Sequence, residues 1–198
     1  MVWTAALCQM FLAAGPCYYE SALGAYKELG LAHEKARLYA DWSLTVHHQG
    51  DEERAYNLAR QALHLSDSVG DRQALAHNML GILAMSQGDL DAARHHLARS
   101  LALAEDLKNP GAHAAALNNL AQIWDAAGDT ARAVAPSEAA LELCSAQGDR
   151  HREAGLDSNL ADLHVDGGEA NAAAAHLKQA AAIFAEVDDQ DGLWQPEK

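Results

Sequence analysis

Histidine is the residue type whose number in this sequence could support chemistry, because eleven histidines occur among 198 residues. Adjacent pairs stand at His47-His48 and His95-His96, but neighbouring side chains on a helix point about 100° apart and do not chelate one ion together. The spacing His-x-x-x-His, which would place two imidazoles on one helix face, does not occur. The pattern therefore predicts solvated or helix-end histidines and no metal site.

Residues for covalent or acid/base catalysis are not in a recognisable arrangement either. The sequence contains no Gly-x-Ser-x-Gly and no glycine-rich phosphate loop. Asp162 and Asp166 share a helix face, as many solvated acids do. The three cysteines Cys8, Cys17 and Cys144 have no CxxC spacing and cannot all pair, which is typical of reduced thiols. We therefore expect no enzymatic activity and no cofactor.

Charge and composition narrow the classes of partner and fold. The chain has 28 Asp and Glu against 14 Lys and Arg, a formal net charge of −14. Because phosphate binding depends on neutralisation by Lys and Arg, nucleic acid and membranes are not expected partners. Hydrophobic residues make up 49% of the chain and aromatic residues 6%, and no stretch alternates apolar and polar residues as a strand would. We predict an all-α, cytoplasmic protein.

The first residues of the chain form a separate case, because 2–14 is almost wholly apolar. This run is too short to span a bilayer and lacks the basic residues that begin a signal peptide. The tract 12–15 faintly resembles a lipoprotein cleavage site, although Pro16 stands before Cys17. We expect a buried first helix, with export as the alternative.

An internal repeat is visible in the turn residues. A glycine followed by an acid recurs at steps of 38, 40 and 40 residues, and a second series of helix breakers lies between these turns. Two interleaved series with one period indicate two helices per repeat. The first series is Gly50-Asp51, Gly88-Asp89, Gly128-Asp129 and Gly168-Glu169, and the second is Gly30, Gly70-Asp71, Asn109-Pro110, Gly148-Asp149 and Asp191-Gly192.

The segments between these breakers have helical periodicity. Apolar residues are spaced by three and four, as in the stripe Leu117, Leu120, Ala121 and Trp124. Glycine supplies the left-handed backbone that ends a helix, and the acid after it can cap the next helix. Ten helices are therefore predicted, at 3–14, 17–29, 32–48, 52–68, 72–86, 90–107, 112–126, 130–146, 150–166 and 170–187.

Small residues recur at fixed distances from each glycine of the first series. Five residues after it stand Ala55, Ala93, Ala133 and Ala173, twelve after it Ala62, Ser100, Ala140 and Ala180, and seven before it Ser43, Gly81, Ala121 and Ala161. Small side chains are needed where neighbouring helix backbones approach closely. In these positions residues 31–187 resemble the tetratricopeptide repeat family. The resemblance implies a right-handed α-solenoid, or superhelix, of about five helix pairs.

The repeat departs from the family pattern in length. Its period is nearer 40 than the usual 34 residues, and it resembles the longer repeats of kinesin light chains and of bacterial STAND-class transcriptional regulators. Pro136 lies inside a second helix and is expected to kink that helix or to move its start later. We expect one repeat domain, 1–198, from a longer protein. Its parts are a degenerate first pair at 1–30, repeats at 31–70, 71–109, 110–148 and 149–187, and a tail at 188–198.

In the tetratricopeptide family the first helix of each pair lines a concave groove, and the resemblance implies which positions face it here. Asparagine recurs among these positions, and its amide can both donate to and accept from a peptide main chain. An apolar patch that contains methionine lies beside the asparagines. Alternatively, the asparagines bond to a neighbouring helix and the patch is covered by the chain or by a second copy. The predicted partner-binding residues are Arg37, Asp41, Leu44, Asn78, Met79, Ile82, Met85, Asn118, Asn119, Gln122, Asn159 and Asp162.

The charge of these positions indicates the kind of partner. Arg37 is the one cation among them, so the Lys and Arg clamp with which chaperone-binding members of the family hold acidic C-termini is lacking. We expect a protein-protein interaction module for a neutral or basic segment with apolar anchors. The resemblance to STAND-class regulators implies the docking or sensor arm of a bacterial signalling or transcription-regulatory protein. The alternatives are a homo-oligomerisation scaffold, such as a homodimer, and an array that senses a small-molecule effector.

Overall fold

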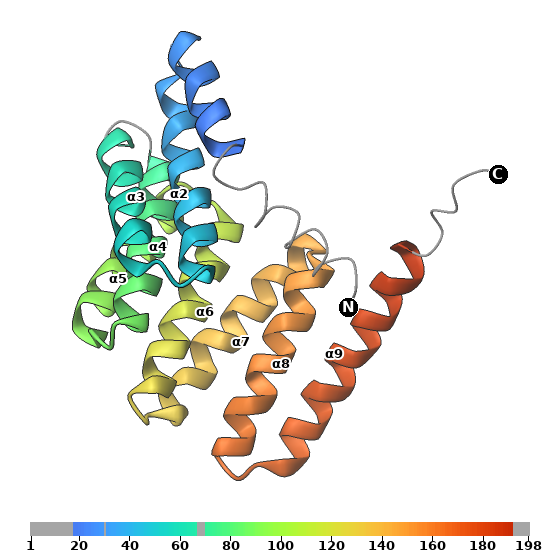
Figure 1. Ribbon diagram of the computed structural model, residues 1–198. Coiled ribbons are helices and arrows are strands. Elements are labelled where there is room, and N and C mark those ends of the chain that lie inside the picture. Colours follow the sequence, from blue (N-terminus) through green and yellow to red (C-terminus); the bar gives the residue numbers. More distant parts are fainter. Residues whose placement is uncertain (1–17, 30, 67–69, 192–198) are drawn as a thin grey trace, which may run out of the picture. The chain divides into compact units, whose positions relative to one another are not determined.

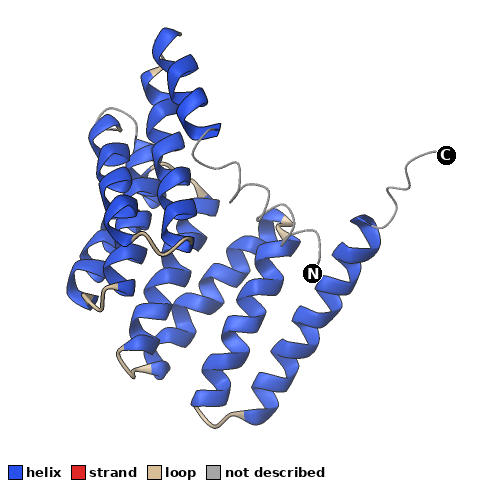
Figure 2. Ribbon diagram, in the orientation of Figure 1, coloured by secondary structure: helices blue, strands red, loops and turns tan. Residues whose placement is uncertain are grey.

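The computed structural model describes residues 18–29, 31–66 and 70–191, and the regular elements in these ranges are all helices (Figure 1). Figure 2 shows the same helices joined by short turns, without a strand in the described part of the chain. Residues 18–28 form a helix where 17–29 was predicted. The predicted helix at 3–14 lies outside the described residues. The all-α prediction is confirmed.

The helices follow the turns that the sequence predicted. The boundaries of α2 agree with the prediction, whereas α3 ends three residues earlier and α9 runs four residues further than expected. In chain order the helices are α2 (Ala32–His48), α3 (Glu52–Leu65), α4 (Gly70–Ser86), α5 (Leu90–Asp106), α6 (Pro110–Ala126), α7 (Thr130–Gln147), α8 (Arg150–Asp166) and α9 (Ala170–Asp191).

The chain divides into two compact units, 1–108 and 109–198. In the first unit α2 packs against α3, α4 packs against α5, and α4 also contacts α2 and α3. In the second unit α7 packs between α6 and α8, and α9 packs against α8, as the orange and red ribbons of Figure 1 show. Each unit is therefore built of helix pairs in which a helix contacts its neighbours in sequence.

The turn inside each helix pair is fixed by its glycine and the acid after it. Gly88 has φ +79°, a conformation that costs other residues energy. The N–H of Gly88 bonds the Met85 carbonyl at 2.9 Å, and the N–H of Asp89 bonds the Ala84 carbonyl at 2.9 Å. The Asp89 carboxylate then accepts from the Ala92 N–H at 2.9 Å and caps α5. Gly50, Gly128 and Gly168 also have positive φ, at +84°, +77° and +75°.

Small side chains fill the interior of each pair, as the repeat predicted. The alanines five residues after the loop glycine are buried: Ala55, Ala93, Ala133 and Ala173. The approach is closest at Gly81, where an added Cβ would lie 2.6 Å from Cγ of the buried Leu97. Ser100 is also buried, and its hydroxyl donates to the Ala74 carbonyl at 2.8 Å, which joins α5 to α4.

Pro136 lies inside α7 without displacing the start of that helix, which remains at Thr130. The expected later start is therefore wrong. Proline removes one backbone donor, while Ala133, Ser137 and Ala140 on either side of it are almost completely buried. Packing of these small residues keeps both parts of the segment helical.

Candidate partner-binding surface

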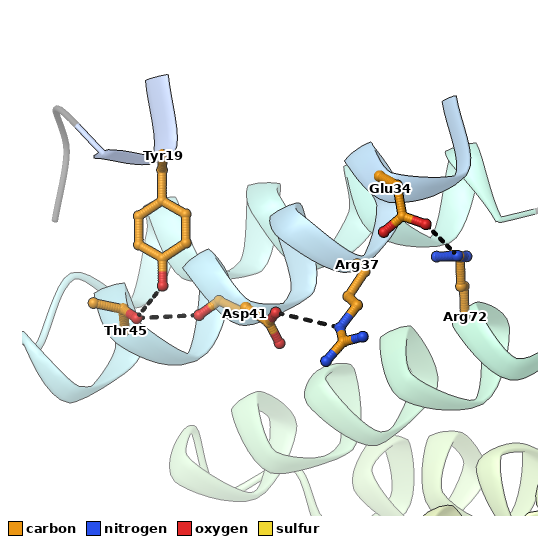
Figure 3. Close-up of polar contacts among 6 residues, drawn as sticks. All are labelled: Tyr19, Glu34, Arg37, Asp41, Thr45 and Arg72. Carbon is orange, nitrogen blue, oxygen red and sulfur yellow. Dashed lines mark hydrogen bonds and ion pairs between the residues drawn. The ribbon is translucent and has the colours of Figure 1, made fainter. Parts of the chain in front are cut away.

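The first unit places part of the predicted groove on α2, which α4 contacts. Arg37 and Asp41 lie one turn apart and are both exposed, with Arg37 Nε 3.8 Å from Asp41 Oδ2 (Figure 3). Leu44 lies three residues further along the helix, and 37% of it is exposed. An acid and an aliphatic side chain are therefore presented together on α2.

A network of hydrogen bonds and ring contacts holds this part of α2 in place (Figure 3). The Thr45 hydroxyl donates to the Asp41 carbonyl at 3.1 Å, so the Tyr19 hydroxyl, 2.9 Å away, donates to Thr45. The Tyr19 ring stacks on Trp42 with centroids 5.3 Å apart and an interplanar angle of 7°. The helix at 18–28 is thereby fastened to α2 next to Asp41.

An ion pair connects α2 to α4 in the same unit. Arg72 Nη2 lies 3.0 Å from Glu34 Oε1, and the side chain of Arg72 is only 21% exposed (Figure 3). Because the pair is partly shielded from water, it is better placed to fix two helices than a fully exposed pair. The two helices that carry the predicted residues are joined through it.

Asp41 is exposed on one side, but the part of the carboxyl that packs against the protein is shielded from water. This partial burial raises the pKa of the Asp41 carboxyl above its ordinary value, and the Arg37 guanidinium lowers it by a smaller amount. The ionised carboxylate is therefore less well stabilised here than in water, although Arg37 is close. A further cation next to Asp41 would lower the energy of the charged form. This is the electrostatic feature of α2 that suits a basic partner.

The structure divides the predicted apolar patch on α4 between surface and core. Met79 is 3% exposed and belongs to the core cluster of the first unit, together with Trp42 and Leu83. Met79 is therefore a core residue and does not form part of an accessible patch. Ile82 is partly buried and packs against the same cluster, while Asn78 and Met85 are half-buried. Ile82 and Met85 are thus the apolar side chains of the predicted patch on α4 that stay partly accessible.

In the second unit two of the predicted asparagines bond to each other. Asn159 Nδ2 on α8 donates to Asn118 Oδ1 on α6 at 2.9 Å. This is the alternative in which the amides connect neighbouring first helices. Asn119 is 9% exposed and is not accessible to a partner. Gln122 on α6 and Asp162 on α8 are exposed, as the prediction requires.

Val165 is a further apolar residue of this kind on α8. Like Met85, it stands three residues before its loop glycine, a position that the family resemblance assigns to the groove. It follows Asp162 by three residues, and 59% of it is exposed. The same spacing separates Leu44 from Asp41 on α2. From here on, each unit has its own first-helix surface: Arg37, Asp41, Leu44 and Met85 in the first unit, and Asn118, Gln122, Asn159, Asp162 and Val165 in the second.

No group of three or more His, Cys, Asp or Glu side chains among the described residues is arranged to hold a metal ion. No helix in the same part of the chain is both long and apolar enough to cross a membrane.

The fold defines the class of protein as an α-helical repeat protein. Residues 71–146 match the tetratricopeptide repeat family model. A comparison with curated protein sequences finds no match.

Solved structures of other helical repeat proteins share this fold. BtubC (BKLC) from P. vanneervenii is similar with a TM-score of 0.71 and 18% identity, over 98% of this chain and 82% of that chain. The apo form of RapI has a TM-score of 0.73 and 15% identity, over 90% and 66%. A putative kinesin light chain protein of Podosopora anserina with nearly identical TPR-like repeats has a TM-score of 0.61 and 17% identity, over 92% and 93%. At these identities the likeness establishes the fold.

Proposed function

We propose that the chain binds a segment of another protein, and that the first-helix surface of each unit can hold such a segment. The tetratricopeptide fold serves as a scaffold for protein-protein interaction and is generally non-catalytic, which supports this class of function. The observation that carries the proposal is a pairing of an exposed acid with an exposed aliphatic residue three positions later. It occurs on α2 as Asp41 and Leu44, and on α8 as Asp162 and Val165.

The chemistry of these pairs supports a particular charge and polarity for the partner segment. A Lys or Arg of the partner would compensate the carboxylate of Asp41, whose charged form burial disfavours. An apolar side chain next to that cation would cover Leu44 and remove its exposed surface from water. The same arrangement of acid and aliphatic side chain lies on α8. The proposed partner is therefore a neutral or basic segment with apolar anchors, and not an acidic tail.

Within the second unit, the asparagine pair can contribute to the contact that Asp162 and Val165 make. Its hydrogen bond uses one N–H of Asn159 and one lone pair of Asn118. The amide nitrogen of Asn118 and the carbonyl oxygen of Asn159 are not consumed by that bond. A donor and an acceptor can therefore face the main chain of a bound segment while the pair stays intact.

The test is a selection of displayed random peptides on the whole chain, followed by fluorescence anisotropy with the selected peptides. We expect sequences that are rich in Lys, Arg and apolar residues and poor in Asp and Glu. Each selected peptide is tested against D41N/L44A in the first unit and D162N/V165A in the second. One of these double substitutions should weaken its binding by about tenfold or more. The matched controls are D91N on α5 and L177A on α9, which change an exposed acid and an exposed aliphatic residue on second helices.

Two results would contradict the proposal. One is the selection of predominantly acidic peptides. The other is binding that D91N or L177A weakens while both first-helix double substitutions leave it intact. In addition, added salt should weaken the interaction, because exposed charges are screened.

The proposed setting is the docking arm of a bacterial signalling or transcription-regulatory protein. It is supported by the repeat length near 40 residues and by a fold shared with aspartyl phosphate phosphatase F from Bacillus subtilis. The expected finding is an ATPase or DNA-binding domain in the same polypeptide. A natural polypeptide that consists of these repeats alone, without such a domain, would contradict this setting. That result would not affect the proposed binding of a partner segment.

A further inference from the structure

Two histidines meet between α4 and α5 of the first unit. His77 Nδ1 on α4 and His96 Nδ1 on α5 lie 3.0 Å apart, with ring centroids 5.2 Å apart and an interplanar angle of 35°. Both side chains are partly buried, so the pair is shielded on one side and reachable from solvent on the other. Two neutral imidazoles at this distance share a single hydrogen, since one nitrogen must donate and the other accept.

The position of this pair in the repeat is informative. His77 stands eleven residues before the loop glycine and His96 eight residues after it. The equivalent positions hold Tyr39 with Leu58 in the first repeat, Leu117 with Pro136 in the third, and Asp157 with His176 in the fourth. The fold therefore does not need a polar pair at this place, because two repeats use apolar residues.

The fourth repeat shows what a structural histidine looks like at this place. His176 Nδ1 lies 2.8 Å from Oδ1 of Asp157, whose side chain is 3% exposed, so a buried carboxylate holds the imidazole. In the second repeat the partner of His96 is a second imidazole and not a carboxylate. Two imidazole nitrogens are therefore brought together at this place, where the fourth repeat has one imidazole and one carboxylate.

The surroundings keep both rings in the neutral form that ligates metals. Burial is the largest of the effects that together lower the pKa of His77 to about 4, and repulsion from Arg99 and from the charged forms of His96 and His95 acts in the same direction. Burial, and then His95, also lowers the pKa of His96. At neutral pH the two nitrogens are therefore not blocked by a second proton. Arg99 disfavours any added cation, which limits the affinity.

The distance fits a metal ion. With metal–nitrogen bonds of about 2.0–2.1 Å, two imidazole nitrogens on adjacent coordination positions are separated by about 2.9–3.3 Å. The separation of 3.0 Å lies in this range. The ring that donates its Nδ1–H must pass to the Nε2–H tautomer, with the Nδ1 proton released to solvent and another taken up at Nε2. Both rings must then turn until the two Nδ1 lone pairs converge on the ion. The geometry points to a binding site for a divalent transition metal, of the imidazole-preferring class of Ni²⁺, Cu²⁺ and Zn²⁺, at His77 and His96.

The site has two protein ligands, and water completes the coordination shell. No third His, Cys, Asp or Glu joins the pair among the described residues. Metal binding would cross-link α4 to α5 and stabilise the folded chain as the ion concentration rises above the dissociation constant. The sequence prediction considered only neighbouring histidines and spacings within one helix, so it did not include ligands from two helices.

The experiment is calorimetric titration of the whole chain with Ni²⁺ in a non-chelating buffer at neutral pH. Cys8 and Cys17 are replaced by serine in all proteins, so that their thiols do not compete. We expect one saturable site, with affinity reduced at least tenfold in H77L and in H96L. Leucine is the chain's own residue at the equivalent positions Leu117 and Leu58, so the helix pair is expected to fold. H176Q, which removes one histidine from α9, should bind Ni²⁺ like the parent protein.

A second measurement uses the protein in which every histidine is retained. Paramagnetic broadening of amide signals by substoichiometric Cu²⁺ should begin in α4 and α5 near His77 and His96. The inference is overturned by absence of saturable binding, by unchanged affinity in both H77L and H96L, by loss of the site in H176Q, or by broadening that begins near His164 and His176. Because none of these readouts involves a peptide, the outcome is independent of the proposed partner binding.

Discussion

At the scale of single residues, the fold changes the pKa of Asp41 on the first-helix surface of the first unit. Burial raises the pKa of this carboxyl, so the folded chain holds its proton to a higher pH than the unfolded chain does. The ionised group therefore costs stability above the folded pKa, and this cost is absent below the unfolded pKa. D41N should raise the thermal midpoint at pH 7, by on the order of 1 °C, because it removes that cost.

The pH series supplies the check on this prediction. The difference between D41N and the parent protein should shrink as the pH falls, and it should vanish below the ordinary pKa of aspartate, where the carboxyl is protonated in both the folded and the unfolded chain. D91N on α5, whose carboxylate side chain is 94% exposed, should leave the midpoint nearly unchanged across the series. A D41N protein that is less stable at pH 7 would mean that the pair with Arg37 outweighs the burial of the charge.

The bond between Asn118 and Asn159 can be measured by a double-mutant cycle. Each single substitution to alanine should lower the free energy of unfolding by about 1 kcal/mol, since one partly buried amide loses its partner. The double substitution should cost less than the sum, because the two amides act as one unit. Urea denaturation of the four proteins gives the coupling, and Q122A serves as the exposed control on α6. Strict additivity would show that the amides do not bond in solution.

Sequence reasoning was limited at this scale by one position of the repeat. The place nine residues before the loop glycine holds Asp41, Met79, Asn119 and Asn159. The resemblance assigned all four to a groove, but Met79 and Asn119 are buried, whereas Asp41 is exposed. This position lies at the border between the exposed and the packed face of the helix. Residue type does not tell whether the side chain there is exposed or buried, because its exposure depends on which neighbouring side chains cover it.

At the scale of helices, the packing of α4 against α5 depends on Gly81. G81A should lower the free energy of unfolding by about 1–3 kcal/mol, because the new methyl group would meet Leu97 and that side chain is completely buried. The matched control is G155A in α8, where nothing lies within 4 Å of an added Cβ. There the substitution should stabilise the chain by about 0.5–1 kcal/mol, because alanine favours the helix. Equal effects in urea denaturation would contradict the close approach at Gly81.

The turn between α5 and α6 contains a residue in an unfavourable conformation. Lys108 has φ +52°, while glycine has the left-handed conformation at the equivalent turn after α7, with Gly148 at φ +69°. K108G should therefore raise the free energy of unfolding by about 0.5–1 kcal/mol. K178G, at an exposed position inside α9, should lower it by about 1 kcal/mol. A loss of stability in K108G would show that a contact of the lysine outweighs the backbone strain.

The helices themselves were largely predictable, because their limits depend on local backbone chemistry. Glycine and the acid after it end one helix and cap the next, and the predicted limits of α2 and α8 agree with the structure. Gly70 was taken as a breaker, yet it is the first residue of α4. The end of α9 also differs, since 188–191 continue the helix beyond the predicted limit. The limit at Gly70 shows that a glycine-acid pair does not always mark a turn, and the end of α9 has no such pair near residue 187 to mark it.

At the scale of the whole molecule, the contacts between neighbouring helices predict where a local change is felt. In a repeat protein each helix pair is stabilised by itself and by its neighbours, so destabilisation spreads over a short distance. G81A should therefore accelerate hydrogen exchange by roughly 10- to 100-fold in α4 and α5, and to a lesser extent in α2 and α3, which contact α4. Exchange in α8 and α9, which belong to the second unit, should stay near that of the parent protein. G155A supplies the opposite case, with slower exchange in α8 and α9. Uniform acceleration of all helices by G81A would show instead that the two units unfold as one cooperative body.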